Sequence, residues 1–223
     1  MCVHRRPQFL RRTLQMLEEQ ADSDFVLIIW DNSEGFWNVY DYLKDTLLNV
    51  FVIGLRKNIG GIGRFYAARD LGLEYKHVIF LDDDQVFGND LVSTFRSEAR
   101  IDSIAGWWAW RIFGDNYFNR SRSNVGEEAD YVGTGGMVVP TLVFHDSDLY
   151  DMLPSKFSRI EDLWLSRYFR SVHGGKLVRS HVKMAFTSQV KFPDQWQHLT
   201  VLKQEFYKYL KSLENSSWKG IGM

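Results

Sequence analysis

The segment His77-Val78-Ile79-Phe80-Leu81-Asp82-Asp83-Asp84-Gln85 decides the fold, because it joins a continuous apolar run to three adjacent carboxylates. A strand that is apolar at every position is buried on both faces, as in a parallel sheet covered by helices on both sides. Adjacent carboxylates repel one another unless a cation is present, and oxygen ligands suit a hard divalent metal ion. The segment therefore predicts a buried strand that ends at a cation site, although an acidic turn open to solvent is the plainer alternative.

Two further apolar runs lie upstream and also end in polar clusters. Phe25–Trp30 ends at Asp31, and Val50–Leu55 is followed by Asn58-Ile59-Gly60-Gly61. Helical spacing of apolar residues predicts helices over Pro7–Gln20, Arg64–Leu73 and Asp90–Ala99. Strands alternating with helices are typical of an α/β fold, here with a mostly parallel central sheet and helices on both faces. Ligands bind outside the carboxyl ends of such strands, so we expect Asp31, Asn58 and Asp82 to line one crevice.

The second half of the chain alternates less regularly. Its expected elements are strands over Trp107–Ile112 and Tyr131–Val139 around a loop over Asp115–Asp130, a helix over Glu161–Val172, short strands over Lys176–Val178 and Val182–Phe186, and an apolar helical stripe over Trp196–Leu213. We find no internal repeat and no low-complexity linker. We therefore expect one domain over residues 1–223.

Composition restricts the classes of function and the expected compartment. The 223 residues contain 27 Lys and Arg against 28 Asp and Glu, so the net charge is 27 − 28 = −1, which argues against a nucleic-acid partner. Cys2 is the single cysteine and cannot form an internal disulfide. The apolar runs are too short to be transmembrane helices or a signal peptide, so we expect a cytoplasmic protein. Weak contact of the lysine-bearing C-terminal stripe with a membrane surface is the minority alternative.

Glu161-Asp162 is a second acidic pair, placed at the start of a predicted helix. Acidic side chains there complement the helix dipole and can cap free N–H groups, which requires no catalytic role. A carboxylate at a helix start that faces a metal-containing crevice can also act as a general base toward a hydroxyl. These two readings are equally compatible with the pair taken alone.

Together, these segments resemble the GT-A glycosyltransferases, and most closely the large inverting family 2. The resembling segments follow the family's order: His4–Leu10, Ile29–Ser33, Asn58–Gly61 with Arg64 and Arg69, Asp82–Asp84 as the D-x-D motif, Gly133–Met137 as the glycine-rich loop, and Glu161-Asp162. The family's first strand carries several apolar residues before its Arg-Pro turn, whereas here only Met1-Cys2-Val3 precede His4. The resemblance thus implies a very short first strand.

The resemblance implies a nucleotide-binding half over residues 1–100 and an acceptor-binding half over residues 101–223. It also implies roles for individual residues. It assigns nucleotide-sugar binding to Asp31 at the base, Asp82 at the ribose, Asp83 and Asn58, to Arg64 or Arg69 at the diphosphate, and to Gly135 and Gly136 at the sugar. It assigns Mn²⁺ or Mg²⁺ to Asp84, with His181 as a further metal candidate. Asp162 would be the base that activates the acceptor hydroxyl, and Glu161 would position it.

The implied partners are a UDP- or GDP-sugar donor and a glycan or glycoconjugate acceptor. Among Trp107, Trp108 and Trp110 we expect at least one core residue, and an exposed one could stack on an acceptor sugar. The acceptor-binding half is short, so a homodimer is one way to complete acceptor binding. Three alternatives stay open: a retaining GT-A enzyme, a non-catalytic nucleotide-sugar-binding protein, and a haloacid-dehalogenase-like phosphohydrolase, whose D-x-D-x-V motif Asp82–Val86 also fits.

Overall fold

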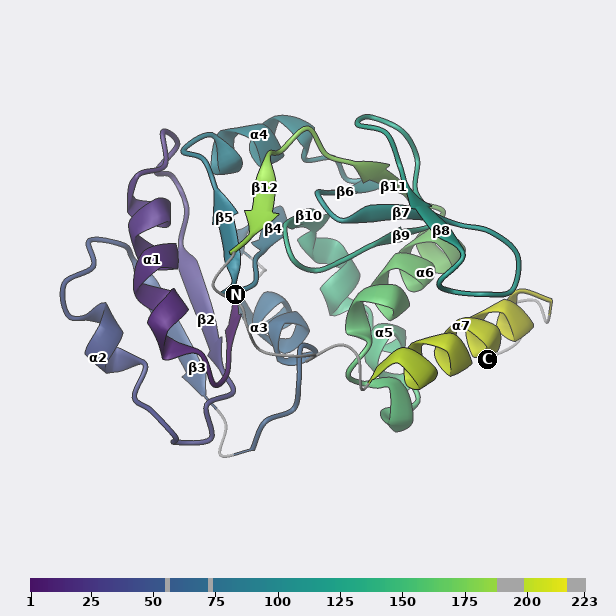
Figure 1. The fold of residues 1–223 in the computed structure, drawn as a ribbon, viewed down its shortest axis with the longest axis horizontal. Coiled ribbons are helices and arrows are strands. Elements are labelled where there is room, and N and C mark those ends of the chain that lie inside the picture. The colour runs from purple at the N-terminus through teal and green to yellow at the C-terminus, as the bar shows by residue number, and fades with distance from the viewer. Residues whose placement is uncertain (55–56, 72–73, 188–198, 216–223) are drawn as a thin grey trace.

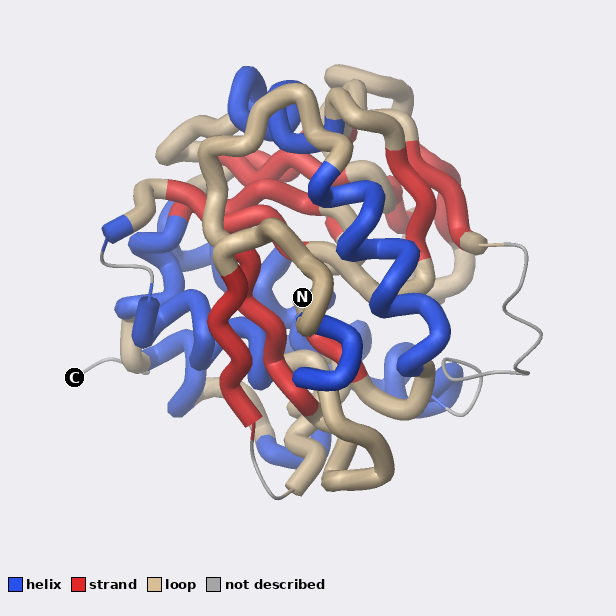
Figure 2. Tube along the Cα trace, turned by 90° about the vertical axis from the view of Figure 1, so that its left-hand side faces the viewer, coloured by secondary structure: helices blue, strands red, loops and turns tan. Residues whose placement is uncertain are grey.

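The computed structural model describes residues 1–54, 57–71, 74–187 and 199–215. Leu55, Leu73 and Trp196, which end or begin three of the predicted elements, lie outside these residues. The strands form the middle of the molecule and helices lie on both sides of them, as Figures 1 and 2 show. In the described part of the chain, no helix has both the length and the apolar character needed to cross a membrane.

The first half of the chain builds a parallel sheet of β1 (Cys2–Val3), β2 (Leu27–Asp31) and β3 (Val50–Gly54). Strand β2 lies in the middle and pairs with β3 over its whole length, from Leu27 opposite Val50 to Asp31 opposite Gly54. Helix α1 (Pro7–Glu18) connects β1 to β2 and begins at Pro7, where the missing N–H costs no helical hydrogen bond. Helix α2 (Tyr40–Leu43) lies in the connection to β3.

A second sheet has the order β11-β6-β10-β4 and is mixed. Its strands are β4 (His77–Phe80), β6 (Ser103–Gly106), β10 (Met137–Pro140) and β11 (Lys176–Arg179). Strand β10 runs antiparallel to both β4 and β6, while β11 is parallel to β6. The expected α/β class with helices on both faces is confirmed, and the antiparallel strand β10 marks where the sheet departs from the parallel arrangement.

Successive residues of the second sheet enter two different apolar cores. Phe80, Ile104 and Val139 pack with helices α3 (Gly63–Leu71) and α6 (Glu161–His173), together with α7 (Thr200–Asn215). Ile79, Ala105 and Val138 pack on the opposite face with α1 and α4 (Leu91–Glu98). This period of two residues, with both faces covered, explains why the strands read as apolar at every position.

The remaining elements surround the second sheet. Strand β5 (Gln85–Phe87) pairs with β12 (Met184–Phe186). A small sheet consists of β7 (Ala109–Ile112), β8 (Arg120–Arg122) and β9 (Tyr131–Val132). The short helices are η2 (Thr141–His145), α5 (Asp148–Asp151) and η3 (Ser155–Phe157). The side chains of Phe206 and Leu210 on α7 are buried in the core, so the C-terminal stripe packs inward, as its apolar spacing indicates.

Two predicted strands are wrong in their limits. The run over Tyr131–Val139 is divided into β9 and β10, because Gly136 adopts φ +83° and turns the chain between them. The run over Trp107–Ile112 begins as a strand only at Ala109, since Trp107 lies in the bend between β6 and β7. Both breaks occur beside the candidate site.

Candidate functional site

Three chain segments meet at the carboxyl ends of β2 and β4. Cys2 of β1 pairs with Trp30 of β2 on one side and forms a parallel bridge with Asp82 on the other. Strand β1 is only two residues long, and it connects the two sheets at this end. The joint brings Asp82, at the end of β4, within one strand of Asp31, at the end of β2, as the sequence predicts for a shared crevice.

Arg6 is the counter-ion of the acidic cluster. Its guanidinium donates to Asp84 Oδ2 at 2.5 Å and also to Asp83 Oδ1. Asp83 is buried, with 3% of its surface exposed, whereas the Asp84 side chain retains 18% exposure. The interpretation of Asp82–Asp84 as an acidic turn open to solvent is therefore wrong, because two of its carboxylates are held by a cation from another element.

Arg64 of α3 joins the D-x-D segment to the Glu-Asp segment. Its guanidinium donates to Asp82 Oδ1 at 2.9 Å, and its Nε lies 3.9 Å from Glu161 Oε1. Arg64 and Glu161 are both buried, and the nearby Gly61 has no room for a side chain, because a Cβ there would lie 1.7 Å from Glu161 Oε1. The Asn58–Gly61 loop, α3 and α6 are thus packed around one buried ion pair.

Burial changes the proton affinity of this cluster. Removal from water raises the pKa of Asp83 to about 7 and that of Glu161 to about 8, although a guanidinium lies near each. Burial also raises the pKa of Asp84, and the neighbouring Asp82 carboxylate adds to the effect. A cation bound beside these carboxylates would favour their ionised forms over their protonated forms. The site therefore favours added positive charge.

The glycine-rich segment closes against the acidic cluster. A Cβ on Gly135 would lie 2.6 Å from Asp82 Oδ2 and 2.4 Å from Gln85 Nε2. This amide nitrogen of Gln85 is buried without a hydrogen-bond partner, while its Oε1 accepts from the Asp82 backbone N–H at 3.1 Å. Gly135 therefore permits a close approach of backbone to the Asp82 carboxylate, and its contact with a donor sugar stays a prediction.

Asp162 lies in the first turn of α6 and is held in one orientation. Its Oδ1 accepts from the Leu163 backbone N–H at 2.8 Å, and its Oδ2 accepts a short hydrogen bond from the Tyr131 hydroxyl. Burial raises the pKa of Tyr131 well above its ordinary value, and the negative charge of Asp162 adds to this. Tyr131 therefore stays protonated and can act as a permanent donor to the carboxylate. The hydroxyl of neighbouring Tyr117 accepts from Arg120 at 2.6 Å.

Asp31 and Asn58 each order their own loop. Asp31 Oδ1 accepts from the Ser33 backbone N–H at 2.7 Å, and Asn58 Oδ1 accepts from the Gly60 backbone N–H at 2.7 Å. The Asn58 amide also lies 3.3 Å from His4 Nδ1. Both side chains are partly exposed at the strand ends, where a ligand could reach them.

Two predicted site residues are not brought to the cluster. The ring of His181 is exposed, and its Nδ1 bonds Glu98 at 2.8 Å, so the expected pairing of His181 with Asp84 is not formed. The reason is the β5–β12 register, which places Thr187, six residues after His181, beside Asp84. Arg69 is exposed and pairs with Asp70 at 2.8 Å, so Arg64 is the arginine of α3 that enters the cluster.

The three tryptophans flank the glycine-rich segment. Trp107 is buried, whereas Trp108 and Trp110 are partly exposed, so Trp107 is the core residue that we expect among them. The Trp108 carbonyl accepts from Gly133 at 2.9 Å. The Arg122 guanidinium lies over Trp107 and Trp108 at 4.9 and 5.2 Å from the ring centroids. Trp108 and Trp110 stay candidates for contact with a sugar.

Sequence reasoning misses two residues of this arrangement, Arg6 and Tyr131. Arg6 is in the quoted opening segment, but its partners Asp83 and Asp84 lie 77 and 78 positions away. The need of adjacent carboxylates for a cation is the signal that could have pointed to an arginine. Nothing in the sequence pairs Tyr131 with Asp162, because the prediction of a strand does not determine which residue a tyrosine side chain in it will contact.

The cluster fits a hard divalent cation in the chemistry of its donors. Asp82 and Asp84 each offer carboxylate oxygens, the type of ligand that such ions take. Among the described residues, no group of three His, Cys, Asp or Glu side chains could by itself hold a metal ion. The remaining ligands would then come from a diphosphate or from water, as is common for Mg²⁺.

Comparisons with known proteins give structural matches only. No family model and no curated protein sequence matches the chain. Among solved structures, GalNAc-T7 with UDP, GalNAc and Mn²⁺ matches 83% of this chain and 42% of its own, with TM-score 0.62 and 12% identity. S. aureus TarS residues 1–349, also solved in complex with UDP, matches 80% of this chain and 55% of its own, with TM-score 0.53 and 18% identity.

This chain therefore spans about half the length of the structures that it matches. At 12% and 18% identity the likeness concerns the fold. The likeness rests on the arrangement of the strands and helices and not on the sequence motifs. The chain has the fold of the GT-A glycosyltransferases.

Proposed function

We propose that this chain transfers a sugar from a nucleoside-diphosphate donor to a hydroxyl of a glycan or glycoconjugate, with inversion at the sugar carbon. The observation that carries the proposal is the position of Arg64, which donates to Asp82 at 2.9 Å and lies 3.9 Å from Glu161. One buried guanidinium thereby links the end of β4 to the start of α6. The segments to which we assign donor binding and the catalytic base therefore lie side by side.

Asp162 is the proposed general base. Its carboxylate takes the proton of the acceptor hydroxyl as the acceptor oxygen forms a bond to the sugar carbon. The bond from this carbon to the diphosphate breaks, and the nucleoside diphosphate leaves with the electron pair. The hydrogen bonds from Tyr131 and from the Leu163 backbone fix the carboxylate before the acceptor arrives. Glu161 is buried beside Arg64 and supports the first turn of α6 from within.

Asp82 and Asp84 are the proposed protein ligands of Mn²⁺ or Mg²⁺. The ion supplies positive charge that neutralises the diphosphate leaving group. Arg6 competes for Asp84, since its guanidinium already donates to Asp84 Oδ2 at 2.5 Å. A metal ion at Asp84 must displace this guanidinium, and the diphosphate would supply further ligands to the ion. We therefore expect nucleotide and metal to bind together. UDP is the first donor nucleotide to test, because UDP is present in the GalNAc-T7 and TarS structures, and GDP is the second.

Alternative functions differ from this proposal in measurable ways. A retaining enzyme would give a product with the donor's anomeric configuration, which NMR of the product distinguishes. A non-catalytic protein would bind nucleotide without turnover. The phosphohydrolase alternative places its motif after the first strand, whereas here Asp82 follows β4 in a GT-A fold, so we do not propose it.

The test is turnover of a panel of UDP- and GDP-sugars with Mn²⁺, followed as release of nucleoside diphosphate with and without glycan acceptors. Asp84→Ala should lose both the Mn²⁺-dependent binding of nucleotide and turnover. Asp162→Asn should keep binding and lose turnover by about 10²–10⁴-fold, the usual contribution of a general base. Asp41→Asn, at an exposed carboxylate paired with Lys44, is the matched control and should behave as the parent chain. Full turnover in Asp162→Asn would exclude this residue as the base.

A further inference from the structure

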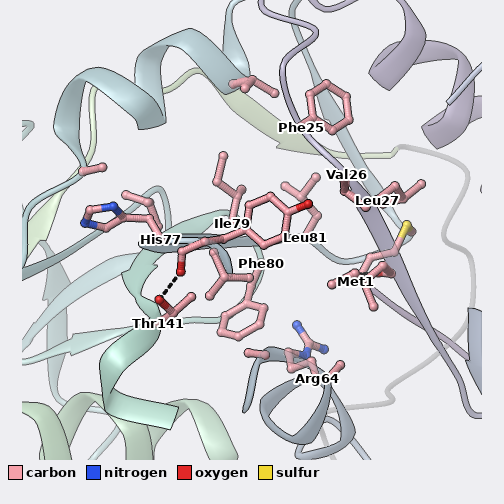
Figure 3. A pocket seen from close by; sticks show the side chains of 18 of the residues that line it. Met1, Phe25, Val26, Leu27, Arg64, His77, Ile79, Phe80, Leu81 and Thr141 are labelled. Carbon is pink, nitrogen blue, oxygen red and sulfur yellow. Dashed lines mark hydrogen bonds between the residues drawn. The ribbon is translucent and has the colours of Figure 1, made fainter. Parts of the chain in front are cut away.

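A cavity of about 390 Å³ lies between β2 and β4, and Arg64 is among the residues that line it (Figure 3). Its walls are the residues Phe25–Ile28 on one side and His77–Leu81 on the other. Ala67 and Ala68 of α3 close it from one face of the sheets, and Leu91 and Val92 of α4 close it from the other. The cavity is therefore a slot between two strands with helices above and below.

Both strands turn an unpaired edge toward this slot. On the side away from β3, β2 pairs only through Trp30 and Asp31, which lie opposite Cys2 and Val3. Strand β4 pairs with β10 on one side, and its other side has only the bridge from Asp82 to Cys2. No other strand of the described residues pairs with these edges. Unpaired backbone N–H and C=O groups in an apolar slot are costly, and strand edges are templates for another strand.

The slot continues the line of β1. Cys2 lies between β2 and β4, parallel to both, and Met1 is among the residues that line the cavity. A strand in this line would have β2 and β4 as neighbours at the usual spacing. It would join the two sheets into one with the order β3-β2-β1-β4-β10-β6-β11.

The nitrogen of Met1 is placed as a strand amide would be. It donates to the Ile28 carbonyl at 2.7 Å, and the Met1 carbonyl accepts from Trp30 at 2.8 Å, so both groups belong to the β1–β2 ladder. Burial lowers the pKa of this amino group to about 6, because a charged ammonium is poorly solvated there. A peptide N–H makes the same hydrogen bond to Ile28 and has no charge to desolvate.

We propose that the slot receives about four or five residues of extended apolar chain, in line with β1 and joined to it at the nitrogen of Met1. Four residues at the amino end of β2 and directly before it, Phe25 to Ile28, line the slot, and at about 3.3 Å per residue they set a length of about 13 Å. The unpaired backbone N–H and C=O groups of both edges favour a strand over a lipid, because an alkyl chain could form no hydrogen bond with them. The proposal does not depend on the proposed catalytic function.

Four proteins test the proposal: the 223-residue chain and three versions with a pentapeptide placed before Met1. The first extension is Val-Ile-Val-Ile-Val, the second Gly-Ser-Gly-Ser-Gly and the third Val-Pro-Val-Pro-Val, which is apolar but cannot complete a strand ladder. We expect only the first to raise the Tm, by at least about 5 °C. Hydrogen exchange of the Ile28 and Ile79 amides should slow in the same protein, because these edges become paired.

Two results would overturn the proposal. Equal Tm values for the Val-Ile and Val-Pro extensions, with unchanged exchange at Ile28 and Ile79, would show that apolar contact alone acts there. A rise in Tm of the 223-residue chain with laurate, equal to that from the Val-Ile extension, would instead make the cavity a lipid site. If the chain and its Gly-Ser and Val-Pro versions are insoluble and only the Val-Ile version is soluble, strand completion is supported by the yield itself.

Discussion

The carboxyl ends of β2 and β4 lie beside charged side chains, whereas the amino ends of the same strands lie beside mostly apolar ones. At the carboxyl ends, Cys2 bridges the strands, and the charged groups of Arg6, Arg64 and the carboxylates fill the space beyond them. At the amino ends the same strands face a slot whose walls are mostly apolar side chains. At the carboxyl ends, ion pairs therefore connect the segments, whereas at the amino ends no strand of the described residues pairs with the facing edges of β2 and β4. The comparison separates the contribution of charged groups from the contribution of strand pairing.

The largest stability effect is expected from Arg64, because it neutralises two carboxylates at the charged end. Arg64→Met would leave Asp82 and buried Glu161 without their guanidinium and should lower the free energy of unfolding by about 4 kcal/mol. Arg69→Met, on the same helix but exposed and paired only with Asp70, should cost less than about 1 kcal/mol. Urea unfolding measures both, and equal effects of the two variants would contradict a central role of Arg64.

A pH dependence should follow from the raised pKa of Glu161. Its pKa rises from 4.5 to about 8 on folding, so between these values the folded state binds more protons than the unfolded state. The contribution of Glu161 to stability is therefore fully present below pH 4.5 and is lost as the pH rises through 8. Glu161→Gln should remove the part of this decline that Glu161 causes, which unfolding experiments at several pH values would measure. Buried Asp83, with its pKa raised to about 7, should maintain a smaller decline in the variant.

The close packing at the charged end can be tested through Gly61. Gly61→Ala should lower the free energy of unfolding by about 2 kcal/mol, since the added methyl group would lie 1.7 Å from Glu161 Oε1 and must displace it. Gly54→Ala is the matched control, because its Cβ would meet the Asp31 side chain at an ordinary 3.6 Å. Thermal or urea unfolding with no difference between the variants would place Glu161 elsewhere than in this structure.

The smallest expected stability effect belongs to the hydrogen bond that orients Asp162. Tyr131→Phe should lower the free energy of unfolding by about 1 kcal/mol and turnover by about tenfold, because Asp162 loses a donor that keeps it fixed. Tyr117→Phe removes a hydroxyl that accepts from Arg120 and should affect turnover less. Parallel measurements of nucleotide binding should show no change in either variant. Weaker binding in Tyr131→Phe would place this tyrosine at the donor instead.

Much of the fold could be predicted because the strands at its centre are apolar at every position. His77–Phe80 and Val50–Gly54 become strands where the sequence predicts them, and the polar residues that follow lie at one edge. Ser103–Gly106 is a central strand that the sequence does not reveal, because Ser-Ile-Ala-Gly has little β preference of its own. The break at Gly133–Gly136 is likewise decided by packing against Asp82 and Trp108.

The sequence predicts the position of a site residue well where a motif places it at the end of a strand. It predicts contacts between residues of two different elements less well. Asp82 and Glu161 are near one another as expected, but the arginine between them could equally have been Arg64 or Arg69 by sequence. The side of α3 that packs inward decides between these arginines. His181 is displaced from Asp84 by the register of β12, which depends on hydrogen bonds that the residue pattern does not encode.

Titration of UDP binding, with and without Mn²⁺, tests most directly whether the charged end holds a nucleotide and a metal. Calorimetry on the parent chain, Asp84→Ala and Asp162→Asn would separate the two acidic segments. We predict Mn²⁺-dependent binding in the parent chain, unchanged binding in Asp162→Asn, and loss of the Mn²⁺ dependence in Asp84→Ala. Equal Mn²⁺-dependent binding in all three proteins would contradict the assignment of the metal to the Asp82–Asp84 cluster.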